Sequence, residues 1–102
     1  DDRIKEYVLD LIGATRNPSA CGLGDLVPMV EFGASPRAAI FLLRAAKAHA
    51  FIRGRAYVTP DDIKALGLDV LRHRVILTYR ADAEGIGPDA LLGRIFEAVP
   101  VP

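Results

Sequence analysis

The stretch SPRAAIFLLRAAKAHAFIRG, residues 35–54, has the pattern of one long helix around which the rest of the chain can be arranged. Ser35 and Pro36 form a helix start signal, because a serine oxygen can accept an unpaired backbone N–H and proline fits the first helical position. The pattern predicts a helix from residue 36 to about residue 53, closed by Gly54. Most of its circumference is apolar, which predicts a central position with one narrow basic seam left open. At 100° per residue, that seam holds three side chains within about 80° of one another: Arg37, Arg44 and Lys47.

Further helical segments are predicted on both sides of this one. Apolar periodicity and helix start signals place them at residues 2–16, 60–66, 69–74 and 88–98. The spacing also predicts which side chains of the first and last of these helices face inward: Ile4, Tyr7, Val8, Leu11 and Ile12 in the first, and Leu91, Leu92, Ile95 and Phe96 in the last. Asn17-Pro18 ends the first, because the residue before a proline is pushed out of the helical region. Thr59-Pro60 repeats the cap-and-proline signal at the start of the helix predicted at residues 60–66, and Gly67 is expected to end that helix.

The segments between the helices predict loops and at most a small piece of sheet. Residues 19–34 carry three glycines and one proline among scattered apolar side chains, which favours an irregular loop pinned to the core by Met29 and Phe32. Residues 75–78 have the β-branched content of a short strand, which could pair with Tyr57-Val58. The sequence therefore predicts a mainly all-α fold, a four- to five-helix bundle with at most a two-stranded scrap of sheet.

Length and composition limit the class of protein to which this chain can belong. The chain has 102 residues, of which 51% are hydrophobic and 25% charged, and these values suit one compact domain over residues 1–102 and exclude intrinsic disorder. No apolar run approaches the roughly 20 residues of a membrane span, and no secretory signal pattern opens the sequence. The lone Cys21 can form neither an internal disulfide nor a structural zinc site, which favours a reducing, cytoplasmic compartment.

Charge is balanced overall but not locally. Thirteen basic and thirteen acidic residues cancel, which argues against a dedicated nucleic-acid binder because such domains usually carry a net positive charge. Residues 32–60 nevertheless contain no Asp or Glu and hold five basic side chains: Arg37, Arg44, Lys47, Arg53 and Arg55. The alternative function is therefore a stand-alone helical binding module that binds nucleic acid through the basic helix at residues 36–55.

The motifs of self-contained enzymes are missing from the sequence. It has no Gly-Lys pair for a phosphate-binding loop, and it lacks H-E-x-x-H, G-x-S-x-G and C-x-x-C. The isolated chain is therefore not expected to be active, and no metal site is predicted. Most of the remaining polar residues have a simpler explanation, as structural histidines, a bystander thiol or helix-capping acids: His49, His73, Cys21, Asp61 and Asp62.

Arg37 differs from these residues in its position. It follows a cap and a proline at the start of the long helix, so its planar guanidinium is rigidly aimed and could hold a phosphate at two points, aided by the positive end of the helix dipole. The other interpretation is a surface ion pair with an acid such as Glu31 or Glu97. Position alone favours neither.

Four motifs in order resemble a known family. Gly33-Ala34-Ser35-Pro36-Arg37-Ala38 is similar to the sensor-two motif of the MoxR family of AAA+ ATPases. RGRAYVTPDDI at residues 53–63, VLRHR at 70–74 and VPVP at 99–102 resemble the C-terminal lid of the same family in order and approximate spacing. The resemblance covers residues 33–102, the first helix is less distinctive, and residues 21–32 match no motif.

The resemblance implies a helical lid that packs over ATP bound by a preceding αβα core, which this chain does not contain. Arg37 would be the sensor-two arginine that reaches the γ-phosphate, with Ser35 and Pro36 fixing where its side chain starts. The core of the same polypeptide would hold most of the ATP with Mg²⁺, and the absence of a methionine at Asp1 fits a piece of a longer protein. The family works as ring oligomers, and it couples ATP hydrolysis to chaperone-like maturation of partner proteins, often ones with a von Willebrand A-type domain.

Overall fold

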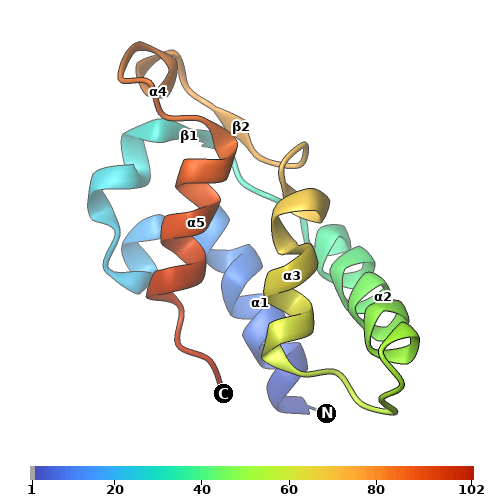
Figure 1. Cartoon of the computed structure of the whole chain (residues 1–102). Coiled ribbons are helices and arrows are strands. Elements are labelled where there is room, and N and C mark those ends of the chain that lie inside the picture. The colour runs from blue at the N-terminus through green and yellow to red at the C-terminus, as the bar shows by residue number, and fades with distance from the viewer. Residues whose placement is uncertain (1) are drawn as a thin grey trace.

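The computed structural model describes residues 2–102. Its elements are, in order, α1 (Asp2–Arg16), the 3₁₀ turns η1 (Pro18–Cys21) and η2 (Gly24–Met29), β1 (Val30–Phe32), α2 (Pro36–Ile52), α3 (Pro60–Leu71), β2 (Ile76–Leu77), α4 (Tyr79–Ala83) and α5 (Pro88–Ala98). The four longest helices run along a molecule of 43 × 21 × 21 Å, and the sheet and α4 form one end of it (Figure 1). The mainly helical fold with one two-stranded antiparallel sheet confirms the predicted fold class. No helix within residues 2–102 is long and apolar enough to cross a lipid bilayer.

The inward faces predicted for the first and last helices are both confirmed. In α1 the predicted apolar face is fully buried: Ile4, Tyr7, Val8, Leu11 and Ile12. In α5 the buried face is also the predicted one: Leu91, Leu92, Ile95 and Phe96. The two helices contact each other, and α3 contacts α5, so the core lies between these elements.

α2 does not occupy the central position that its sequence predicts. Its buried side is made mostly of alanines: Ala38, Ala39, Leu42, Ala46 and Ala50. Its larger apolar side chains are instead between 40% and 82% exposed: Ile40, Phe41, Phe51 and Ile52. Small side chains let one face of α2 pack closely against α1 and α3, which leaves the bulky ones outside. The prediction of a helix open only along a narrow seam was therefore wrong, and α2 lies at one side of the bundle (Figure 1).

The strand that pairs with β2 was also predicted wrongly. β2 pairs antiparallel with β1, in the register Val30 to Leu77 and Phe32 to Ile76, and Tyr57-Val58 is not a strand. The 3₁₀ turns η1 and η2 occupy most of the predicted loop and carry the chain back beside β2. Thr78 closes the sheet: its backbone N–H donates to the Met29 carbonyl at 2.9 Å, and its hydroxyl donates to the Pro28 carbonyl at 2.7 Å.

The two side chains expected to pin the predicted loop behave differently. Met29 is buried, as predicted, whereas Phe32 is 61% exposed. The short helix α4 follows β2 and was not predicted. Its N-cap is Thr78, whose hydroxyl accepts a hydrogen bond from the backbone N–H of Ala81.

Helix α3 continues through the glycine expected to end it. The predicted short helix and the following turns form one helix as far as Leu71, and Gly67 lies buried within it. A Cβ built on Gly67 would lie 2.1 Å from Cζ of the Phe96 ring on α5. Gly67 therefore provides space for an aromatic ring where α3 and α5 meet, and its role is packing rather than termination.

We expect Gly67→Ala to destabilise the chain by about 1–3 kcal/mol, because the buried ring of Phe96 must be displaced. Gly93→Ala on α5 is the matched control, since a Cβ there meets nothing within 4 Å, and it should be neutral or stabilising by up to about 1 kcal/mol. Urea unfolding followed by circular dichroism measures both. Equal unfolding midpoints for the two variants would contradict the packing role.

Candidate functional site

The N-terminus of α2 has the backbone geometry that its sequence predicts. Ser35 is the N-cap residue in an extended conformation, with φ −77° and ψ 162°, and Pro36 occupies the first turn. The Ser35 carbonyl accepts a hydrogen bond from the backbone N–H of Ala38 at 2.9 Å. The Ser35 hydroxyl makes no capping hydrogen bond, so the prediction that this oxygen caps the helix was wrong. The backbone and the proline, rather than the serine side chain, begin α2 here.

The segment that leads into α2 is fixed to the end of α1. The buried hydroxyl of Thr15 accepts a hydrogen bond from the backbone N–H of Ala34 at 2.9 Å and donates one to the Ile12 carbonyl at 2.6 Å. Next to it, a Cβ on Gly33 would lie only 2.6 Å from backbone atoms of Thr15 and Arg16. Only glycine allows this approach of two backbones. We name Thr15, Gly33 and Ala34 the α1 anchor; it fixes where α2 starts, and sequence reasoning missed the part played by Thr15.

Arg37 projects from the start of α2 as an exposed side chain. Within residues 2–102 it forms no ion pair, with Glu31, Glu97 or any other acid. Next to it in the sequence, Ser35 and Pro36 line an open hollow of about 440 Å³, which is also lined by the cation Arg16 and the carboxylate Glu31 but not by Arg37 itself. The surface ion pair offered as the other interpretation of Arg37 is therefore not formed, and the guanidinium is available to an anion.

The exposed face of α2 carries both basic and apolar side chains. Arg44 and Lys47 are exposed and, like Arg37, have no acidic partner among the described residues. Phe41 lies on the same face, and the guanidinium of Arg74 stacks on its ring at 4.5 Å from the centroid. The predicted basic seam is thus exposed to solvent, but it is part of a broader exposed face that also carries apolar side chains.

The positive charge of Arg55 does not add to the predicted basic surface, because Arg55 is paired with an acid. Its guanidinium donates two hydrogen bonds to the buried carboxylate of Asp62, at 2.8 and 2.7 Å. Asp62 also accepts hydrogen bonds from the backbone N–H and the hydroxyl of Thr59, and its Oδ1 lies 2.7 Å from Nδ1 of His49. We call these four residues the Asp62 network.

Electrostatics and geometry assign the Asp62 network to the fold rather than to acid–base chemistry. The hydrogen bonds from Arg55 hold the pKa of Asp62 well below its usual range, although burial opposes this effect. The same contact raises the pKa of Arg55. Thr59 and Asp62 form a complete capping box at the start of α3. The prediction that His49 and Asp62 have structural roles is confirmed. The sequence alone did not show that Arg55 joins them.

The remaining candidate residues show no constellation for catalysis. The thiol of Cys21 is partly buried and lies 3.3 Å from the Pro18 carbonyl. His73 is exposed. Within residues 2–102 no group of three His, Cys, Asp or Glu side chains is placed to hold a metal ion. Among the described residues, the exposed Arg37 at the start of α2 is the candidate for binding an anion.

Comparisons with known proteins show which family the chain belongs to. A family model described as the AAA lid domain matches residues 27–95. The chain is 43% identical to the chaperone MoxR1 of Mycobacterium tuberculosis over 97 residues, which cover 95% of the chain and 26% of that protein. It is 38% identical to the protein MoxR of Paracoccus denitrificans over 105 aligned positions, covering 97% of the chain and 31% of that protein.

A solved structure has the same fold. The crystal structure of a candidate ATPase from Cytophaga hutchinsonii superposes with a TM-score of 0.96 at 42% identity, and it covers 100% of this chain and 31% of that one. The chain thus spans between a quarter and a third of the length of these relatives. The family model covers more than half of the chain, and the motifs of residues 33–38 fall within it. The chain therefore belongs to the AAA lid domain family, as the lid domain of a MoxR-type AAA+ ATPase.

Proposed function

We propose that residues 1–102 form the lid of an ATPase whose core precedes them in the same polypeptide, and that Arg37 is its sensor-two arginine. The observation that carries this proposal is the state of Arg37, which is exposed, without an acidic partner among residues 2–102, and held at a helix start by the α1 anchor. Within residues 2–102, the Arg37 guanidinium therefore forms no ion pair that would stabilise the lid itself. It is available to a phosphate.

The chemistry of the site suits the terminal phosphates of ATP. The fork of a guanidinium can contact two phosphate oxygens, and the positive end of α2 adds to the attraction. In this proposal Ser35 and Pro36 fix where the Arg37 side chain starts, because α2 begins at these residues. Contact with the γ-phosphate would stabilise the charge that develops during phosphoryl transfer, and it would couple the nucleotide state to the angle of the lid. In this proposal the core would hold Mg²⁺ and most of the nucleotide.

The remaining functional assignments belong to the whole protein. In this proposal it is cytoplasmic, forms a ring with neighbouring subunits and uses ATP hydrolysis for chaperone-like maturation of partner proteins, including ones with a von Willebrand A-type domain. The name of one relative, chaperone MoxR1, supports the chaperone-like part of this proposal. The exposed face of α2, with Phe41, Arg44 and Lys47, suits contact with other parts of such an assembly, because it is partly apolar and carries no Asp or Glu.

The test is steady-state ATP turnover by the full-length protein with and without Arg37→Ala. We expect a fall of at least about ten-fold, equivalent to about 1.4 kcal/mol of lost transition-state stabilisation, while nucleotide binding is retained. Arg53→Ala is the matched control, because Arg53 is an exposed arginine at the other end of α2, and it should change turnover less than two-fold. Turnover unchanged by Arg37→Ala would exclude the sensor-two role.

The alternative function, nucleic-acid binding, has a separate test. Arg37, Arg44, Lys47 and Arg53 are exposed, but Arg55 is neutralised by Asp62. A phosphate-binding module should bind duplex DNA with an affinity that falls steeply as salt concentration rises. We expect no saturable duplex binding by this chain. Steep salt-dependent binding together with unchanged turnover of Arg37→Ala would favour the binding module instead.

A further inference from the structure

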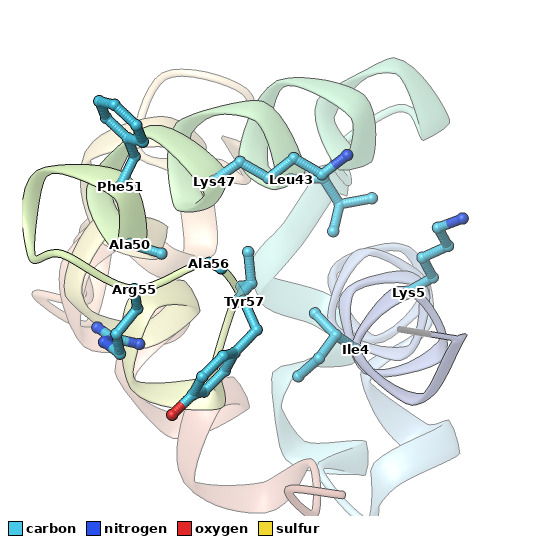
Figure 2. A pocket seen from close by; sticks show the side chains of 10 residues that line it. Ile4, Lys5, Leu43, Lys47, Ala50, Phe51, Arg55, Ala56 and Tyr57 are labelled. Atoms are coloured by element: carbon cyan, nitrogen blue, oxygen red, sulfur yellow. The ribbon is translucent and has the colours of Figure 1, made fainter.

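A groove opens at the end of the molecule away from the sheet, between α1, the C-terminal half of α2 and the segment 53–59. Its volume is about 460 Å³. Figure 2 shows Ile4 from α1, Leu43 from α2 and Tyr57 from the connecting segment facing the same space. Arg37 lies near the other end of α2, between about 9 and 21 Å along the helix from the α2 residues that line the groove, at 1.5 Å per residue. The groove is therefore a feature that the proposed sensor-two role does not use.

The walls of the groove are apolar, and large aromatic side chains stand at its edge. Ile4 and Ala50 are buried beneath it, whereas Phe51 is 81% exposed and Tyr57 is 66% exposed. An aromatic side chain left this open beside a hollow gains free energy when a second apolar group covers it. The groove is thus suited to receive an apolar side chain of a ligand.

The rim of the groove is positively charged without compensation. Lys5 on α1 and Lys47 on α2 both line it, both are exposed, and neither forms an ion pair within residues 2–102. Figure 2 shows both lysine side chains extended, with their nitrogen atoms away from the ring of Tyr57. Among residues 2–102 no Asp or Glu lines the groove, and the third cation there, Arg55, is already neutralised by Asp62. A ligand with negative charge on both sides of an apolar group would complement this arrangement.

We propose that this groove binds a short acidic peptide segment of a partner protein, with an aromatic or aliphatic side chain inserted between α1 and α2 and carboxylates on Lys5 and Lys47. A peptide is favoured over duplex nucleic acid because the bases of a duplex are stacked inside it and do not cover Tyr57 and Phe51, and because only two unpaired cations line the groove within residues 2–102. Each ammonium group gains a charged partner on binding, and the apolar side chain of the peptide leaves water.

The experiment measures fluorescence anisotropy of a labelled peptide, Glu-Asp-Phe-Leu-Asp-Glu, with this chain and with the full-length protein. We expect saturable binding that weakens as salt concentration rises. Lys5→Glu and Lys47→Glu should each weaken binding at least five-fold, and Tyr57→Ala should also weaken it. Lys64→Glu is the matched control, because Lys64 is an exposed lysine on α3 that does not line the groove, and it should change affinity less than two-fold. Circular dichroism confirms that each variant is folded.

Several outcomes would overturn the proposal. Absence of saturable binding would do so, as would equal binding of the peptide Lys-Lys-Phe-Leu-Lys-Lys. A loss of affinity for Lys64→Glu as large as that for Lys47→Glu would show general charge attraction rather than a groove. Binding by this chain but not by the full-length protein would show that the rest of the polypeptide covers the groove. Self-association of the chain that Lys47→Glu abolishes, measured by sedimentation, would assign the groove to a second copy.

Discussion

Asp62→Ala should destabilise the chain by about 3 kcal/mol, the lower end of the usual cost of removing one partner from a buried ion pair, because the Arg55 side chain is 27% exposed. The carboxylate is fully buried and receives hydrogen bonds from Arg55, Thr59 and His49. Its loss leaves the Arg55 guanidinium without its partner and removes the capping box of α3. Urea unfolding at neutral pH measures the change. Asp61→Ala is the matched control: this neighbouring carboxylate is exposed in the same helical turn, so its loss should cost less than about 1 kcal/mol.

The same network predicts how stability depends on pH. Because the pKa of Asp62 is lower in the folded state than in the unfolded chain, its stabilising contribution is complete above the unfolded pKa of about 4 and declines as pH falls below it. The difference in unfolding free energy between wild type and Asp62→Asn should therefore be smaller at pH 3 than at pH 7. A difference that is the same at both pH values would show that the charge of Asp62 does not carry the effect.

Gly33→Ala should destabilise the chain by about 3 kcal/mol or more, at or beyond the upper end of the usual cost of overpacking. The added Cβ would lie 2.6 Å from three backbone atoms of Thr15 and Arg16, and backbone cannot turn aside as a side chain can. The two segments must separate, which breaks the hydrogen bond between Ala34 and Thr15. Gly24→Ala is the matched control, since a Cβ there meets nothing within 4 Å. A thermal unfolding midpoint for Gly33→Ala equal to that of Gly24→Ala would refute the close approach.

Strong local patterns predicted the elements that depend on few distant contacts. The apolar spacing of α1 and α5 predicted both their boundaries and their buried faces, because each is an amphipathic helix with one apolar side. The start of α2 followed from Ser35 and Pro36, and the candidate role of Arg37 followed from its place after them. Features of this kind depend on residues that are neighbours in the sequence.

The features that were missed depend on residues far apart in the sequence. β1 has three residues, too few to show a period, and it pairs with β2 more than forty residues later. Gly67 was interpreted as a helix end because glycine is a common C-cap, whereas its neighbour Phe96 comes from another helix. The anchoring role of Thr15 needs Ala34, nineteen positions away. The outward position of α2 follows from close packing of its alanines, which periodicity of apolar residues cannot distinguish from complete burial.

The continuity of α2 has a mechanical consequence. No glycine or proline interrupts it between Arg37 and Ile52, so its two ends turn as one rigid rod. The α1 anchor holds the end that carries Arg37, and the groove with Lys47 lies toward the other. A rod of seventeen residues is about 25 Å long, so a tilt of about 10° at the anchored end displaces the far end by about 4 Å. A small rotation of α2 at the Arg37 end would therefore move its far end, beside the groove, by a distance comparable to the width of a side chain.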